Sequence, residues 1–226
     1  QSTASGMGAV FASLACMLGA GDRLVASKAL FGSCDYVCTV LMPQYGVETV
    51  TVASTDLAEW ERALSKPTKA VFLETPSNPM MQILDIEAIA ELAHKAGARL
   101  IVDNVFATPI YQNPLQLGAD IVMYSTTKHI DGQGRTLGGA VLTNDADYYQ
   151  GHMRMFIRHT GPTLSPFNAW VLTKALETLE LRVRAQAAAA ADIADFLGRQ
   201  ADVTAVIFPG LDSHPQADLI GKQMSG

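Results

Sequence analysis

Short apolar runs and amphipathic segments alternate along the first two thirds of the chain. Runs rich in valine, leucine and isoleucine predict buried strands at 23–27, 47–52, 70–73, 99–102, 121–124 and 140–143. The segments between them predict helices at 9–18, at 35–44, shortly after Asp56, at 86–96 and at 145–158. Strands that alternate with helices at this spacing indicate right-handed crossovers. We therefore expect a three-layer α/β/α domain around a mostly parallel sheet.

The pattern changes in the last third of the chain. A Gly- and Pro-containing break at 161–166 is followed by a long helical segment, rich in alanine and leucine, at 167–197. Its length predicts a connector at 166–199, after a first domain at 1–165. The run at 203–208 predicts the first strand of a smaller second domain at 200–226. Because the chain starts without methionine and stops on a polar segment, we expect both domains to be incomplete parts of a longer protein.

Composition and charge narrow the class of protein. The 226 residues carry a net charge of −6 without any cluster of lysine and arginine, which argues against nucleic acid and anionic membranes as partners. No apolar stretch is long enough to span a bilayer, so we expect a soluble cytoplasmic protein that binds small molecules. The three cysteines have neither zinc-site nor disulfide spacing. We expect free thiols and no metal site.

Polar residues follow three consecutive predicted strands. The run at 70–73 ends in Glu74, the run at 99–102 ends in Asp103-Asn104, and the run at 121–124 ends in Ser125-Thr-Thr-Lys128. The carboxyl ends of parallel strands share one edge of a sheet, where ligands bind. A lysine directly after a buried run needs an explanation, and desolvation lowers the pKa of a lysine amine and makes it a nucleophile. We interpret Lys128 as a reactive amine in a pocket.

The start of the first predicted helix offers a phosphate site. Small residues at 3–8 leave free backbone N–H groups there, and the helix dipole favours an anion. A nicotinamide-binding domain would also suit the sheet. However, Gly6-Met-Gly8 is not a dinucleotide fingerprint, because no predicted strand precedes it and Phe11 stands where the third glycine would be.

Together these groups are what pyridoxal 5′-phosphate (PLP) requires. The Lys128 amine would form a Schiff base with the aldehyde, and the Asp103 carboxylate would keep the pyridine nitrogen protonated. The phosphate would lie on the N–H groups of Gly6 and Met7 and on the hydroxyls of Ser125 and Thr127.

Four segments resemble the Cys/Met-metabolism PLP enzymes of fold type I, and the resemblance extends over the whole chain. They are Ser5-Gly-Met7, Glu74-Thr-Pro-Ser-Asn-Pro79, Val102-Asp-Asn-Val-Phe-Ala-Thr-Pro109 and Ser125-Thr-Thr-Lys128. The resemblance implies the aspartate aminotransferase-type fold, with Lys128 as cofactor anchor and proton carrier and Asp103 as partner of the ring nitrogen. It also implies that Asn78 donates to the ring 3′-oxygen. Phe31 would stack on the ring where several relatives have tyrosine, and it lacks the hydroxyl.

Within the family, the segments 30–34, 128–135 and 158–162 are most similar to members that act on O-succinylhomoserine. The implied reaction is γ-replacement in methionine biosynthesis, in which sulfide displaces succinate and homocysteine is released. Other members use O-acetylhomoserine, join cysteine to the homoserine ester or eliminate from methionine. These activities stay open, as does a fragment without catalysis.

The resemblance also implies a homotetramer made of dimers that share active sites. A Tyr-x-Arg segment, which binds the phosphate from the neighbouring subunit, would lie before Gln1. The arginine that binds the substrate carboxylate would lie after Gly226. We therefore expect this chain alone to bind the cofactor without turning over.

Overall fold

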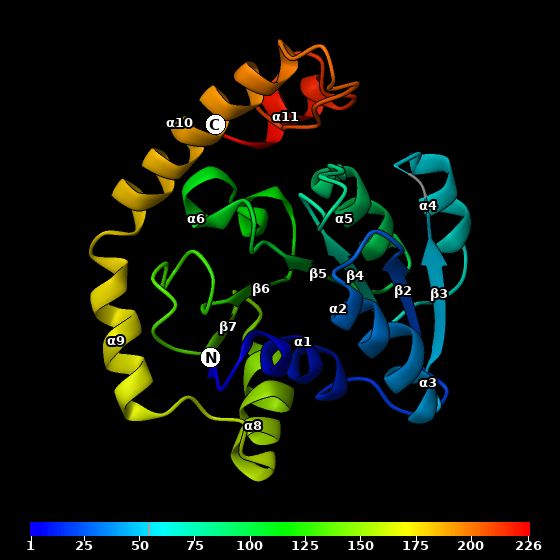
Figure 1. The fold of residues 1–226 in the computed structure, drawn as a ribbon. Coiled ribbons are helices and arrows are strands. Elements are labelled where there is room, and N and C mark those ends of the chain that lie inside the picture. The colour runs from blue at the N-terminus through cyan, green and yellow to red at the C-terminus, as the bar shows by residue number, and fades with distance from the viewer. Residues whose placement is uncertain (54) are drawn as a thin grey trace.

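The protein is built around one sheet, seen in a computed structural model that describes residues 1–53 and 55–226 (Figure 1). Within these residues the strand order is β1-β7-β6-β5-β4-β2-β3. The pairs from β6 to β3 are parallel, whereas β7 pairs antiparallel with β6 and β1 pairs antiparallel with β7. The mostly parallel sheet predicted from the sequence is confirmed. The strands are β1 (Ser2–Thr3), β2 (Arg23–Ser27), β3 (Glu48–Val52), β4 (Ala70–Glu74), β5 (Arg99–Asp103), β6 (Ile121–Ser125) and β7 (Gly139–Thr143).

Most of the longer helices begin at a residue that caps them. The side chains of Ser5, Asp85 and Ser165 each accept a hydrogen bond from a backbone N–H group in the first turn, which would otherwise lack a partner. The predicted helices at 35–44 and 145–158 each contain a π-helical turn, at 37–41 and 149–153. The helices are α1 (Gly6–Ala15), α2 (Gly32–Tyr36), α3 (Met42–Gln44), α4 (Leu57–Ala63), α5 (Ile86–Lys95), α6 (Thr108–Tyr111), α7 (Ala146–Tyr148), α8 (Arg154–Thr160), α9 (Pro166–Leu176), α10 (Leu179–Gly198) and α11 (Ala217–Gln223).

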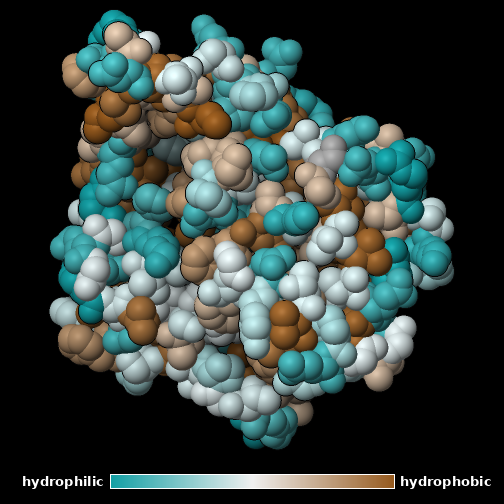
Figure 2. Space-filling model, turned by 45° about the vertical axis from the view of Figure 1, so that its right-hand side comes forward, coloured by the Kyte–Doolittle hydropathy of each residue, from teal (hydrophilic) through white to brown (hydrophobic). Residues whose placement is uncertain are grey.

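The sheet separates two hydrophobic cores. On one face Phe72, Ile101 and Met123 pack with residues of α1, α2 and α8. On the other face Leu73 and Val102 pack with residues of α4 and α5. Alternate strand residues point to opposite faces, which gives the predicted three layers. Figure 2 shows one face of the molecule, on which hydrophilic and hydrophobic side chains are mixed.

The same alternation decides where the polar strand ends point. Glu74 comes two residues after Phe72, Asp103 two after Ile101, and Ser125 two after Met123. All three therefore lie on the face covered by α1 and α2. β4, β5 and β6 are neighbours in the sheet, so this face carries the predicted site.

Three expectations differ from the structure. A strand, β1, does precede Gly6. It has only two residues and pairs antiparallel with β7 at the edge of the sheet, whereas the strand before the glycines of a dinucleotide-binding unit is a central parallel one. The predicted single helix at 167–197 is two helices, α9 and α10, separated by Glu177 and Thr178.

The prediction of a strand at 203–208 is wrong. This segment pairs with no strand among the described residues, and a strand needs a partner for its backbone groups. It leads instead to α11, which packs beside α5 and the segment after α6: the Gln223 side chain accepts a hydrogen bond from the Ile86 backbone N–H (3.0 Å) and donates one to Gln112 (2.9 Å). Every helix in the described part of the chain is too short or too polar to cross a membrane.

Candidate active site

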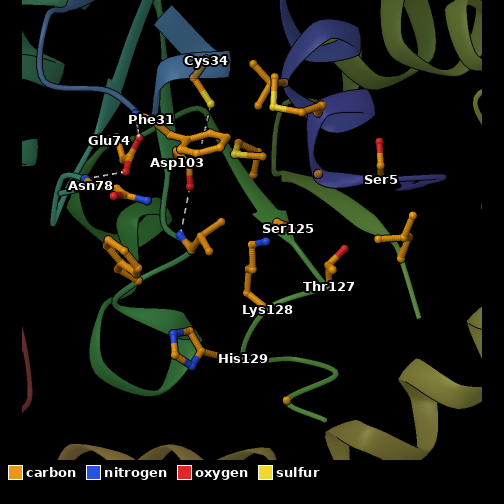
Figure 3. A pocket seen from close by; sticks show the side chains of 18 of the residues that line it. Ser5, Phe31, Cys34, Glu74, Asn78, Asp103, Ser125, Thr127, Lys128 and His129 are labelled. Atoms are coloured by element: carbon orange, nitrogen blue, oxygen red, sulfur yellow. Dashed lines mark hydrogen bonds between the residues drawn. The ribbon is translucent and has the colours of Figure 1, made fainter. Parts of the chain in front are cut away.

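A cavity of about 580 Å³ opens at the carboxyl ends of β4, β5 and β6, beside the start of α1 (Figure 3). Its volume falls in the range that small-molecule sites occupy. All eight site residues predicted from the sequence line it: Gly6, Met7, Phe31, Asn78, Asp103, Ser125, Thr127 and Lys128. The structure thus brings together residues from five separate segments. Their individual roles stay predictions.

Asp103 is the buried carboxyl group of the cavity, with 5% of its surface exposed. One oxygen accepts a hydrogen bond from the Val105 backbone N–H at 3.0 Å. Burial raises the pKa of Asp103 to about 8, and the neighbouring Glu74 carboxyl adds to that effect. A cation beside Asp103 would oppose both effects, so this end of the cavity favours a positively charged group.

Glu74 joins two of the segments that line the cavity. Its Oε2 accepts a hydrogen bond from the Phe31 backbone N–H at 2.6 Å, and its Oε1 accepts one from the Asn78 backbone N–H at 2.8 Å. Burial raises the pKa of Glu74, while both N–H donors lower it. Figure 3 shows these two hydrogen bonds as dashed lines, with the Phe31 ring and the Asn78 side chain near the carboxyl group. Glu74 therefore fixes the backbone of the Phe31 segment relative to that of the Asn78 segment.

Cys34 forms a small buried cluster with Glu74 and Asp103. Its Sγ lies 4.0 Å from Asp103 Oδ2, and the ligand-type atoms of Cys34, Glu74 and Asp103 all lie within 4.8 Å of one another. Burial raises the pKa of the Cys34 thiol far above its ordinary value, and both carboxylates raise it further. The thiol therefore stays neutral and acts as a weak donor to Asp103. It is one of three free cysteines in the described part of the chain, of which Cys34 and Cys38 are buried and Cys16 is half-buried.

The other end of the cavity has the features of an anion site. Ser5 caps α1 by accepting a hydrogen bond from the Gly8 N–H at 3.0 Å, which leaves the earlier N–H groups of the helix start without helical partners. A Cβ atom on Gly6 would lie 2.5 Å from the Ser125 Cβ, so only glycine allows the helix start to approach Ser125 this closely. The Thr127 hydroxyl exchanges hydrogen bonds with Gly138, accepting from its N–H at 3.1 Å.

Lys128 lies in the loop between β6 and β7 and reaches the cavity, as Figure 3 shows. The position of Lys128 after a buried strand predicts a desolvated amine. This prediction is wrong: Lys128 lines the cavity, but its side chain is exposed. A ligand over the amine would supply the desolvation that the chain itself does not.

Two further residues, His129 and Gln186, line the cavity, and their side chains form a hydrogen bond at 3.2 Å. Because His129 flanks the lysine, the sequence leaves it open between loop packing and the edge of the cofactor site. Gln186 comes from α10, nearly sixty positions after the lysine, and no local pattern marks it. Sequence position alone leaves Glu74 as either a structural or an orienting carboxylate, and the structure shows that it links the Phe31 and Asn78 segments.

Solved structures with this fold place it among the PLP-dependent transferase-like proteins. Cystathionine γ-synthase from Xanthomonas oryzae pv. oryzae, solved in complex with aminoacrylate and cysteine, is 37% identical and superimposes with a TM-score of 0.96. The similarity covers 100% of this chain and 58% of that one. A fold of this class with a lysine, a buried carboxyl group and a helix start around one cavity defines a PLP-binding domain.

The family follows from the sequence comparisons. The sequence model described as "Cys/Met metabolism PLP-dependent enzyme" matches residues 1–226, and the chain belongs to that family. O-succinylhomoserine sulfhydrylase from Mycobacterium tuberculosis is 59% identical over 224 residues, which are 99% of this chain and 55% of the relative. The enzyme of the same name from Pseudomonas aeruginosa is 45% identical, with the same coverage. The chain thus spans about half the length of these relatives.

The residues present fit the cofactor of this family, pyridoxal 5′-phosphate. The space that a Gly6 side chain would fill gives a phosphate access to the helix start and Ser125. At the opposite end lies the buried Asp103 carboxyl group, whose pKa of about 8 a positively charged ring nitrogen would lower, so that the group would be ionised beside it. Lys128 lines the same cavity and is accessible.

Proposed function

We propose that the full-length protein catalyses γ-replacement on O-succinylhomoserine, with sulfide as the nucleophile. One O-succinylhomoserine and one hydrogen sulfide would give one homocysteine and one succinate. The observation that carries the proposal is the convergence of Lys128, Asp103, Phe31 and Asn78 on one cavity. The 59% identity to a relative named for this substrate supports the choice of ester.

When bound, PLP supplies an aldehyde that condenses with an amine and a ring that accepts the electron pair left by a departing proton. Asp103, ionised beside the protonated ring nitrogen, would hold that charge in place. Asn78 would donate a hydrogen bond to the ring oxygen, and the Phe31 ring would fix the cofactor plane. Gly6, Met7, Ser125 and Thr127 would bind the phosphate.

Lys128 would anchor the cofactor and then carry protons. After the substrate amine has replaced it, its free amine would remove the Cα proton and then a Cβ proton. Succinate would then leave from Cγ and sulfide would add there, after which the Lys128 amine would return one proton to Cβ and one to Cα. Phe31 has no hydroxyl, so the proton transfers fall to Lys128.

The test begins with PLP added to the full-length protein. A visible absorption band that borohydride fixes onto Lys128, located by peptide mass spectrometry, is the expected result. Absence of the band, or a label on another lysine, overturns the cofactor role. Product analysis then distinguishes the activities: homocysteine from O-succinylhomoserine and sulfide supports the proposal. Faster turnover with O-acetylhomoserine, with cysteine as nucleophile or with methionine alone replaces it by the corresponding activity.

We also propose that the full-length protein assembles as a homotetramer. Large apolar side chains lie exposed on α9 and α10, with Phe167 69%, Trp170 60% and Leu181 73% exposed. Exposed apolar side chains close together mark contact surfaces. Light scattering on the full-length protein should give four times the chain mass, and a monomer mass would reject the proposal.

A further inference from the structure

The loop that carries Lys128 has little regular structure of its own. Within it the Gly132 N–H donates to the Lys128 carbonyl at 2.7 Å, and the Asp131 N–H donates to the Thr126 carbonyl at 2.9 Å. The two carbonyl groups that directly follow the lysine, those of His129 and Ile130, accept from outside the loop. Their donor is Arg182 of α10.

Arg182 is half-buried and uses its guanidinium group on backbone and hydroxyl oxygens. Nη1 donates to the His129 carbonyl at 2.8 Å, and Nη2 donates to the Ile130 carbonyl at 2.9 Å. The other side of the fork reaches the junction of α9 and α10, at the Ala175 carbonyl (3.0 Å) and the Thr178 hydroxyl (3.1 Å). In the described part of the chain no carboxylate forms an ion pair with it. The guanidinium group of Arg182 thus binds three backbone carbonyl groups.

Gly132 shows how closely the guanidinium packs on this loop. A Cβ atom on Gly132 would lie 1.7 Å from Arg182 Nη1, and the residue has φ +68°. Gly134, two positions later, has φ +67° but nothing within 4 Å of its Cβ position. Both glycines therefore adopt a positive φ that disfavours other residues. Only at Gly132 would a side chain also collide with Arg182.

We propose that Arg182 is the positioning residue for the Lys128 amine, an inference that rests on the proposed role of Lys128 as cofactor anchor. Arg182 holds the two peptide groups that follow Lys128. It thereby fixes the direction in which the flexible side chain of Lys128 leaves the backbone. A planar fork suits this task because it binds two adjacent carbonyls at once, which a lysine in its place does not do. Through the α9–α10 junction, the same residue ties the loop to the connector.

The experiment uses the full-length protein and matched variants. Arg182→Gln removes the charged fork, and Arg184→Gln, two positions along α10, removes an exposed arginine that pairs with Glu180. PLP is added, and the label fixed on Lys128 by borohydride is measured by mass spectrometry over time. We expect labelling about tenfold or more slower in Arg182→Gln, since charged hydrogen bonds are lost, an unchanged rate in Arg184→Gln, and partial recovery in Arg182→Lys.

Hydrogen exchange gives a readout that does not depend on the cofactor. Peptides covering 126–135 should exchange faster in Arg182→Gln, while β5 peptides keep the rate of the unaltered protein. Gly132→Ala should reproduce the slow labelling, and Gly134→Ala should do so much less. This pair of alanine variants decides the question if Arg182→Gln does not fold.

Two outcomes would overturn the inference in different ways. If the unaltered protein labels Lys128 and Arg182→Gln labels it equally fast, or if the two glycine variants behave alike, Arg182 does not position the lysine and the proposed function stands. If the unaltered protein leaves Lys128 unlabelled, the proposed function fails and takes this inference with it.

Discussion

Glu74 and Asp103 stand directly opposite each other, as in-register neighbours on the parallel strands β4 and β5. Both are 5% exposed, and their side chains leave the sheet on the same face. Two carboxyl groups this close in a buried site resist ionising together. They differ in their donors: Glu74 accepts two backbone N–H groups and Asp103 accepts one. Without a cation in the cavity, Asp103 is therefore the carboxyl group that is mainly protonated.

The pKa of Asp103 predicts how stability changes with pH. In an unfolded chain the group loses its proton near pH 3.8, and in the folded protein it keeps the proton up to about pH 8. Between these values only the folded state holds the proton, so the free energy of unfolding of the cofactor-free protein falls as pH rises. Asp103→Asn should flatten that fall, measured by urea unfolding across the range. Part of the fall in the free energy of unfolding should remain in Asp103→Asn, because the pKa of Glu74 is raised as well.

A bound cation removes this effect between pH 3.8 and about pH 8, because Asp103 is then ionised in the folded state as well. With PLP present, the ionised Asp103 is paired, so the cofactor should stabilise the unaltered protein most near pH 8. Asp131 and Asp145 have lowered pKa values and affect stability only on the acid side. A steep fall with pH that persists unchanged in Asp103→Asn would show that another group holds the proton.

Glu74→Gln tests the bridge between the Phe31 and Asn78 segments. A glutamine can accept from one N–H group, but its NH₂ then faces the other donor. Bonds to a charged acceptor contribute about 1.5–3 kcal/mol each, so cofactor affinity should fall about tenfold or more. Fluorescence titration of the cofactor-free protein with PLP measures the change. The control is Glu61→Gln, an exposed position on α4; equal affinities for the two variants would refute the bridging role.

Gly6→Ala tests the phosphate end of the cavity. The added Cβ would meet the Ser125 Cβ at 2.5 Å, so the helix start and the serine must move apart. We expect weaker binding of PLP and of inorganic phosphate alike, both measured by calorimetry. Gly19→Ala is the control, because nothing lies within 4 Å of its Cβ position. If Gly6→Ala binds phosphate as well as Gly19→Ala does, the phosphate lies elsewhere.

The strands and the polar residues at their ends could be predicted because both signals are local. A run such as Leu100-Ile-Val ends in Asp103 within the sequence itself, and parallel strands bring such ends to one edge. Glu74, Asp103 and Lys128 were found in this way.

The remainder depends on contacts that no local pattern encodes. Arg182 and Gln186 reach the site because α10 packs beside the lysine loop, more than fifty positions away. The segment 203–208 has the composition of a strand, yet without a neighbouring strand it forms none. The exposure of Lys128 is likewise a property of the surrounding shape and not of the run that precedes it.

Phe31 offers a test of which group carries protons. Phe31→Tyr restores the hydroxyl that several relatives have, while keeping the ring that lines the cavity. If Lys128 carries the protons, kcat should change by no more than a few fold in this variant. Phe31→Ala should weaken PLP binding by roughly three- to tenfold, because an aromatic contact contributes about 0.5–1.5 kcal/mol. A large gain in kcat for Phe31→Tyr would mean that the hydroxyl can do work that the lysine does poorly.

Gln223→Ala tests whether α11 belongs to the folded first domain. The Gln223 side chain accepts a hydrogen bond from the Ile86 N–H and donates one to the Gln112 side chain. The Gln112 amide in turn donates to the Asn104 side chain at 2.7 Å and to the Thr75 carbonyl at 2.9 Å. Its loss leaves a buried donor and a buried acceptor unpaired, which should lower the free energy of unfolding by about 1–3 kcal/mol.

Urea unfolding of this chain measures that difference, with Gln200→Ala as the control. Gln200 is exposed, and within the described residues its side chain bonds to the Phe196 carbonyl of its own helix end, so loss of that side chain should change stability by less than about 0.5 kcal/mol. Because Gln112 also holds the loop that follows Asp103, the Gln223 variant should bind PLP more weakly as well. Equal stability of the two variants would mean that α11 is not docked in solution, and the polar cluster around Gln112 would then have to be satisfied by water.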